Sequence, residues 1–98
     1  MSYTLIIPIF NEKKSIPILL KQLKQLEKTV FTILINDGST DGTKDLLLEL
    51  NNSQLSVIHN RKNIGKGGSI IKAIEIKTAK NNLYLYIVLY INYLLSSI

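Results

Sequence analysis

The sequence predicts an open α/β fold in which three strand–helix units share a parallel sheet. Residues 3–10, 30–36 and 55–59 are rich in β-branched and aliphatic side chains and have the length of buried strands. A segment with helical spacing of apolar residues follows each of them, and this alternation is typical of parallel sheets with right-handed crossovers. A chain of 98 residues forms at most one domain of this kind.

The first unit begins with the apolar strand Tyr3–Phe10. Proline has no backbone N–H, so we expect Pro8 near the end of this strand, where the ladder of hydrogen bonds is finishing. Ser15 is a suitable N-cap, and Pro17 then falls in the first helical turn, where a missing N–H does no harm. The leucine spacing that follows predicts a helix from Ile16 to about Lys28.

The second unit consists of a strand at Val30–Asn36 and a helix at about Thr43–Leu50. The third consists of a short strand at Leu55–His59, a polar loop at Asn60–Gly68 and a helix at about Ser69–Lys80. The next strand would come from the segment after this helix.

Composition narrows the classes of function. A hydrophobic content of 46% and a net charge of +5 indicate a globular chain. The lysines are spread along the chain without interleaved aromatic residues, so we expect no nucleic-acid partner. The absence of cysteine excludes disulfides and thiolate chemistry, and the N-terminus lacks the pattern of a secretory signal. We therefore expect a cytoplasmic protein.

Polar residues follow each predicted strand, and these loops should open on the same edge of the sheet. The first loop contains Asn11 and Glu12, the second is Asp37–Gly42, and the third contains Asn63–Gly68. In open α/β sheets, ligands bind at the carboxyl ends of the strands. The three loops together therefore predict a binding site.

Asp37 is the strongest candidate in this site. A carboxylate directly after a buried strand is costly unless it is hydrogen-bonded or contacts a ligand. It could accept a hydrogen bond from a nucleobase N–H or a ribose hydroxyl, which is the interpretation we favour. The alternative is that Asp37 caps its own turn. For Asp41 we favour the structural interpretation, as the cap of the next helix.

The glycine-rich segment Gly65, Lys66 and Gly67 is suited to binding an anion. Its glycines allow the backbone to come close to the anion, its lysine supplies a positive charge, and the start of the following helix points toward it. It matches neither a Walker A loop nor a dinucleotide fingerprint, and the alternative is a flexible loop with a solvated lysine. Glu12 is as compatible with a nucleotide contact as with a solvated surface position. His59 has no ligand-type neighbour at suitable spacing, and we expect it to be structural. We find no metal ligands and no catalytic residue.

Three ordered motifs, IIPIFNEKKSI, ILINDGSTDGT and NIGKGGSIIKAIE, resemble the N-terminal part of family 2 glycosyltransferases. This family includes the dolichyl-phosphate mannosyltransferase-like enzymes and other polyprenyl-phosphate sugar transferases. The resemblance implies a GT-A fold, which is Rossmann-like, and a nucleotide-diphosphate sugar as donor. It also implies sugar transfer to an acceptor, for which a polyprenyl phosphate is one candidate, with a divalent metal (Mg or Mn) as cofactor.

By position, the resemblance carries nine residues over to the nucleotide site of the family: Pro8, Asn11, Glu12, Asp37, Gly38, Ser39, Gly65, Lys66 and Gly67. The first three resemble the first loop of the nucleotide pocket. The second three resemble the aspartate that contacts the base or ribose and the residues that shape its turn. The last three resemble the loop beside the nucleotide and its phosphates.

The chain departs from the family after the third helix. The family continues into an Asp-x-Asp-type motif that holds the metal, whereas residues 88–93 here read VLYINY and the last acidic residue is Glu75. Metal ligands and the downstream catalytic region are therefore missing. We expect residues 1–80 to be the truncated N-terminal part of a family 2 domain, with parent activity in sugar transfer but inactive alone. The alternative is a non-catalytic nucleotide-binding or partner-binding module.

Residues 81–98 form an uncharged hydrophobic tail. Three interpretations stay open: out-of-frame or prematurely ended sequence, which we favour; an extra edge strand with a partner-binding surface; and a membrane anchor. Residues 83–98 are shorter than the roughly 20 residues that a spanning helix needs. Without such an anchor, the protein would associate with the membrane through a polyprenyl acceptor. This would place it at the cytoplasmic membrane face.

Overall fold

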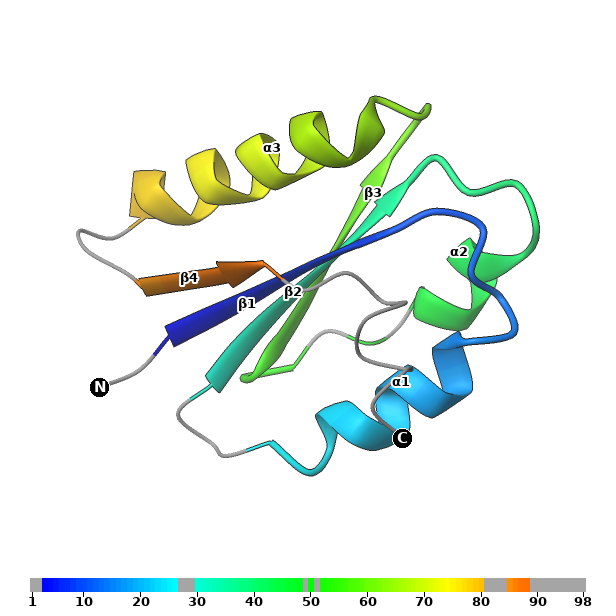
Figure 1. Cartoon of the computed structure of the whole chain (residues 1–98), viewed down its shortest axis with the longest axis horizontal. Helices are drawn as coiled ribbons and strands as arrows, with labels where there is room; N and C mark the ends of the chain where they lie inside the picture. The colour runs from blue at the N-terminus through cyan, green and yellow to red at the C-terminus, as the bar shows by residue number, and fades with distance from the viewer. Residues whose placement is uncertain (1–2, 27–29, 49, 51, 81–84, 89–98) are drawn as a thin grey trace.

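The computed structural model describes residues 3–26, 30–48, 50, 52–80 and 85–88. In this part of the chain, four parallel strands form one sheet in the order β3-β2-β1-β4 (Figure 1). The strands are β1 (Tyr3–Ile9), β2 (Val30–Asp37), β3 (Leu55–Asn60) and β4 (Leu85–Val88). The carboxyl ends of β1, β2 and β3 therefore meet at one edge, as predicted.

Three helices cover the two faces of this sheet in the described residues. Helices α1 (Ile16–Leu23) and α2 (Thr43–Leu47) lie on one face, and α3 (Gly65–Lys80) lies on the other (Figure 1). The predicted three βα units with a parallel sheet are confirmed.

The core has two layers, because successive residues of a strand point to opposite faces of the sheet. The layer beneath α1 and α2 contains the buried residues Ile7, Ile9, Ile16, Leu19, Leu34 and Leu47. The layer beneath α3 contains the buried residues Ile6, Ile33, Ile35 and Ala73. Burial on both faces explains why β1 and β2 are almost continuously apolar instead of alternating.

Several predicted boundaries differ from the observed ones. Helix α1 ends at Leu23, well before the predicted end near Lys28, and residues 27–29 lie outside the described part. Ser15 occupies the N-cap position of α1, but its side chain makes no capping hydrogen bond. Helix α2 ends at Leu47, whereas the prediction extended it to Leu50.

The start of α3 is the largest correction. The sequence predicts a loop through Gly68 and a helix from Ser69, whereas the helix begins at Gly65. Gly65, Lys66 and Gly67 are therefore the first turn of a helix and not part of a flexible loop. Glycine weakens a helix in isolation, so this early start requires stabilisation from elsewhere in the fold.

Strand β4 lies inside the hydrophobic tail and pairs with β1, from Tyr3↔Leu85 to Ile6↔Val88. Pro8 lies beyond this pairing, so its missing N–H removes no bond to β4. The position expected for the metal-binding motif, residues 88–93, falls almost entirely outside the described residues. Within the described part, no helix is long and apolar enough to cross a membrane.

Candidate functional site

Hydrogen bonds join the loops that follow β1 and β2. The N–H of Asn11 donates to Ser39 Oγ at 3.0 Å, and Asn11 Oδ1 accepts the N–H of Thr40 at 2.8 Å. The N–H of Lys13 donates to Asp41 Oδ2 at 3.1 Å. The two loops therefore form one unit at the carboxyl edge of the sheet.

Two of the predicted site residues, Asn11 and Glu12, contribute backbone N–H groups to this unit. Asn11 has a φ of +51°, a left-handed conformation that asparagine tolerates better than most residues. Glu12 donates its backbone N–H to Thr43 Oγ1 at 3.2 Å. The structure thus gives Asn11, Glu12 and Ser39 a part in holding the loops together, and their contact with a nucleotide stays a prediction.

Asp41 caps α2, which agrees with the structural interpretation. Its Oδ1 accepts the backbone N–H of Thr43 at 3.0 Å and also the hydroxyl of the same residue. The Thr43 hydroxyl, together with the backbone N–H groups of Thr43 and Lys13, holds the pKa of the Asp41 carboxyl below its ordinary value.

Asp37 caps α3 from the end of β2, which lies far from α3 in the sequence but pairs with β3 in the sheet. Only 3% of its surface is exposed, and its Oδ1 accepts the Asn60 Nδ2–H at 3.0 Å and the Ile64 N–H at 2.8 Å. Its Oδ2 accepts the N–H of Gly65 at 2.8 Å. Burial raises the pKa of this carboxyl, but the hydrogen bonds from Ile64, Asn60 and Gly65 outweigh it, so the pKa lies below its ordinary value. Asp37 is therefore a buried anion that stabilises the early start of α3.

Gly38 allows the loop after β3 to pass close to the end of β2. Its φ is +71°, and a Cβ at this position would lie 2.5 Å from the backbone N of Asn63 and 2.5 Å from the backbone C of Lys62. The Nδ2–H of Asn63 donates to the backbone oxygen of Asp37 at 3.3 Å. Gly38 therefore leaves room for the neighbouring loop.

Sequence reasoning missed a polar cluster beneath α3. Asn60 Nδ2, which donates to Asp37, also donates to Ser69 Oγ at 3.1 Å, and Lys72 Nζ donates to Asn60 Oδ1 at 2.6 Å. Asn60 lies directly opposite Asp37 in the pairing of β2 with β3. The sequence therefore signals this cluster only by a polar residue at the end of each of two strands, Asp37 and Asn60. No local motif marks Ser69 or Lys72.

A cavity of about 150 Å³ opens between the end of β1 and the start of α3. It is lined by Pro8, Ile9, Phe10, Asp37, Asn63, Gly65 and Lys66. Four of the nine predicted site residues are in this lining, and Phe10, which is 45% exposed, is an aromatic wall that sequence reasoning missed. The other five predicted residues lie outside the lining: Asn11, Glu12, Gly38, Ser39 and Gly67.

His59 has a structural environment, as expected. The Asn36 amide oxygen accepts the Ser39 N–H at 3.2 Å, which directs the amide nitrogen to His59 Nδ1 at 3.1 Å. His59 Nδ1 must then be the acceptor, so the proton of the neutral ring is assigned to Nε2. Burial lowers the pKa of His59, and the positive charge of Lys44 lowers it further.

The described residues do not supply a divalent-metal site. Among them, no three carboxylate or imidazole groups converge. Asp37 and Asp41 lie at this edge, but the oxygens of both accept hydrogen bonds from the protein. A hard divalent cation requires several oxygen ligands, and this arrangement does not provide them.

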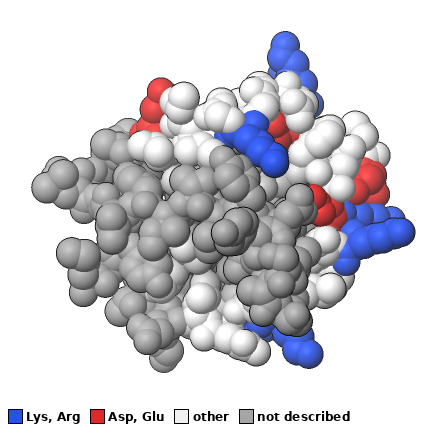
Figure 2. Space-filling model, in the orientation of Figure 1, with Lys and Arg blue, Asp and Glu red and all other residues white. Residues whose placement is uncertain are grey.

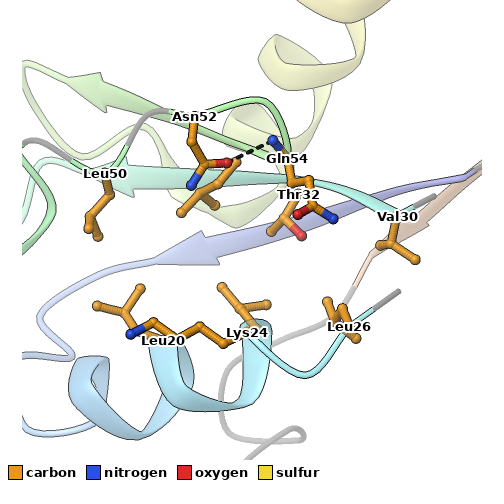
Figure 3. A pocket seen from close by; sticks show the side chains of 10 residues that line it. Leu20, Lys24, Leu26, Val30, Thr32, Leu50, Asn52 and Gln54 are labelled. Atoms are coloured by element: carbon orange, nitrogen blue, oxygen red, sulfur yellow. Dashed lines mark hydrogen bonds between the residues drawn. The ribbon is translucent and has the colours of Figure 1, made fainter. Parts of the chain in front are cut away.

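A second and larger cavity, of about 330 Å³, lies at the opposite edge of the sheet (Figure 3). Its walls are mostly aliphatic and come from α1 and the residues just after it, the first residues of β2 and β3, and the segment before β3: Leu20, Leu23, Lys24, Leu26, Val30, Thr32, Leu50, Asn52, Gln54 and Leu55. None of the predicted site residues is in this lining, so it is separate from the carboxyl-edge site.

Charge is mixed on the surface seen in Figure 2, where Lys and Arg side chains lie beside Asp and Glu side chains. This described face therefore has no field of a single sign.

The curated relatives are longer than this chain. An uncharacterized protein from Methanocaldococcus jannaschii is 40% identical over 87 residues, which are 85% of this chain and 36% of that protein. Undecaprenyl-phosphate 4-deoxy-4-formamido-L-arabinose transferase from Aeromonas hydrophila is 33% identical over 87 residues, or 82% of this chain and 26% of that enzyme. The chain thus spans about a quarter to a third of the length of these relatives.

A solved structure and a family match complete the comparison. A mannosyltransferase from Pyrobaculum calidifontis, solved in complex with GDP-Man and Mn²⁺, superposes with a TM-score of 0.66 at 21% identity, over 76% of this chain and 24% of that one. This likeness confirms the predicted Rossmann-like half of a GT-A fold. The model of the family described as "Glycosyl transferase family 2" matches residues 4–90 of this chain. The chain belongs to glycosyltransferase family 2, as its three motifs predict.

Proposed function

We propose that this chain is the nucleoside-holding part of a sugar transferase and binds the nucleoside diphosphate of a nucleotide sugar at the carboxyl-edge cavity. The observation that carries this proposal is the lining of the cavity, which combines the exposed ring of Phe10, the Asp37 carboxylate and the Lys66 side chain. These groups match an aromatic base, a hydrogen-bond donor of the nucleoside and a phosphate, respectively.

The part that Asp37 can play in such a site is limited. An ionised carboxylate has about four acceptor positions, and Asp37 already accepts three N–H groups from Asn60, Ile64 and Gly65. The Ser69 side chain also hydrogen-bonds this carboxylate and lowers its pKa, so little acceptor capacity remains for a ligand. Its main contribution to the site is to fix the position of the wall formed by Asn63, Gly65 and Lys66.

For the whole protein we propose transfer of the sugar to an acceptor, with a polyprenyl phosphate as the acceptor class, at the cytoplasmic face of a membrane. Support comes from the Aeromonas hydrophila relative, whose name gives undecaprenyl phosphate. We further propose that residues 1–80 are the N-terminal part of the catalytic domain. The described residues offer no metal site, so any divalent ion would be held by ligands elsewhere in the whole protein.

Titration calorimetry of the chain with UDP, GDP, UDP-glucose and GDP-mannose, with and without Mn²⁺, tests the proposal. We expect metal-independent binding of the nucleotides, and we expect Lys66→Met to weaken it about tenfold, because a charge-assisted hydrogen bond to phosphate is lost. Lys21→Met is the matched control, since Lys21 is exposed on α1 and is not in the lining.

Phe10→Ala should weaken nucleotide binding by a similar factor without affecting the affinity for inorganic pyrophosphate, which has no base to stack. Binding that requires Mn²⁺ would contradict the account of the metal site. Failure of the folded chain to bind any of the four compounds would contradict the proposed function. Binding without transfer in the full-length protein would favour the alternative of a non-catalytic module.

A further inference from the structure

We propose that Lys72 is a positioning residue, which orients the Asn60 side chain and through it holds Asp37 and the first turn of α3 at the cavity. Lys72 lies about two turns into α3 and is not among the residues that line the cavity. Its consequence for nucleotide binding rests on the proposed function, whereas its effect on the protein itself does not.

The first step is the orientation of an amide. A lysine ammonium group can only donate hydrogen bonds, and Lys72 Nζ lies 2.6 Å from Asn60 Oδ1. The oxygen of the amide is therefore directed to Lys72. The nitrogen is directed to the other side, toward Asp37 and Ser69.

The second step is that both N–H groups of Asn60 Nδ2 are used, toward Asp37 Oδ1 at 3.0 Å and Ser69 Oγ at 3.1 Å. Asn60 is 7% exposed and Ser69 is 0% exposed, so solvent has little access to replace a lost partner. A reversed amide would place its oxygen against the Asp37 carboxylate and its nitrogen against the Lys72 ammonium. Lys72 thus favours one of the two amide orientations, the one that Asp37 requires.

The third step links Asp37 to the cavity wall. Asp37 Oδ1 accepts a bond from Asn60 and also from the N–H of Ile64, while Oδ2 accepts the N–H of Gly65. Gly65 lines the cavity and Lys66 follows it in the first turn of α3. A displacement of Asn60 would therefore move the carboxylate that anchors this turn, although Lys72 itself touches no ligand.

Amide hydrogen exchange on the whole chain tests this relay without any nucleotide. In Lys72→Met, which keeps an unbranched side chain but has no donor, we expect the N–H groups of Ile64 and Gly65 to exchange about tenfold faster than in the unmodified chain. The N–H of Leu34, in the core of β2, should keep its protection. Lys72→Arg retains donors and should restore slow exchange, and the surface control Lys21→Met should have no effect.

Nucleotide affinity is the second measurement, by titration with GDP and UDP. We expect Lys72→Met to weaken nucleotide binding about tenfold and Lys72→Arg to retain the affinity of the unmodified chain. Position 72 is not in the lining of the cavity, so this effect would act through Asn60 and Asp37. If the unmodified chain binds no nucleotide, the proposed function fails, and the exchange experiment still decides the relay.

Unchanged exchange at Ile64 and Gly65 in Lys72→Met would overturn the proposal. Equal acceleration at Leu34 would also overturn it, since Lys72 would then stabilise the whole fold and position nothing. If Lys72→Met does not fold, Lys72→Gln replaces it, because an uncharged amide can donate or accept and so does not force the Asn60 oxygen to face position 72. Exchange at Gly65 that is faster in Lys72→Gln than in Lys72→Arg supports the relay, and equal exchange in the two variants contradicts it.

Discussion

Asp37 accepts the backbone N–H of Gly65 at 2.8 Å and so caps a helix that begins 28 residues after it in the chain. Helices are usually capped by a residue immediately before their first turn. Here the cap comes from the end of a neighbouring strand, and it holds the loop after β3 and the start of α3 in one place. One carboxylate therefore fixes the position of both the loop after β3 and the start of α3.

Replacement of this carboxylate by an amide of the same shape should be costly. In Asp37→Asn, the amide nitrogen must face one of the N–H groups that Asp37 accepts, and the charge that strengthens the remaining bonds is lost. We expect a loss of about 2–3 kcal/mol in the free energy of unfolding, measured by urea denaturation. Asp41→Asn is the matched control at a more accessible cap and should destabilise the chain much less. A loss in Asp41→Asn as large as that in Asp37→Asn would refute the special role of Asp37.

Acid should destabilise the chain through the same residue. The pKa of the Asp37 carboxyl is lower in the folded chain than its model-compound value of 3.8. Its contribution to stability is therefore complete above pH 3.8 and is lost as the pH falls from that value through the folded-state pKa. Urea midpoints measured between pH 2.5 and 6 should drop at the acid end, and the drop should be smaller in Asp37→Asn. An identical pH profile in the variant would contradict this assignment.

Two glycines at the site should respond oppositely to alanine. At Gly38, a methyl group would meet backbone atoms 2.5 Å away in a left-handed conformation, so we expect Gly38→Ala to cost more than about 2 kcal/mol. At Gly67, in the first turn of α3, the added Cβ has no heavy atom within 4 Å apart from its chain neighbours and the backbone of its own helix.

Gly67→Ala should accordingly stabilise the chain by about 0.5–1 kcal/mol, because alanine loses less backbone entropy in a helix. Thermal unfolding of both variants measures this contrast. A stable Gly38→Ala chain would mean that the loop after β3 lies further from β2 than described.

His59 should contribute a second pH dependence at milder acidity. In the folded chain, burial and then the positive charge of Lys44 lower the pKa of His59 below its ordinary value of 6.5. Its contribution to stability is therefore complete above pH 6.5 and is lost as the pH falls from 6.5 toward the folded-state value. NMR titration of the ring carbons should give a pKa below 6.5, and Lys44→Met should raise it. A pKa above 6.5 would show that the ring gains a partner when protonated.

The strands and the loops that follow them could be predicted, because their signals are local. Apolar runs define β1 and β2, and the polar turn after Asp37 marks the edge where the cavity lies. The start of α3 could not be predicted, since glycines argue against a helix and the stabilising cap is 28 residues away.

Within the site, the same distinction decides what sequence reasoning could find. Pro8, Asp37, Gly65 and Lys66 were identified from motifs and do lie around one cavity. Asn60, Ser69 and Lys72 belong to no motif, and they matter only because pairing of β2 with β3 and packing of α3 bring them to Asp37.

The order of strands in the sheet has a consequence for how the chain acquires its structure. Strand β1 is synthesised before the other three described strands but lies in the interior of the sheet, between β2 and β4. Its pairing with β2 closes a short stretch of chain, whereas its pairing with β4 (Tyr3↔Leu85) must wait for about eighty further residues. During synthesis one edge of β1 therefore stays open until β4 has been synthesised, and this nascent intermediate is the species most exposed to wrong pairing with another strand.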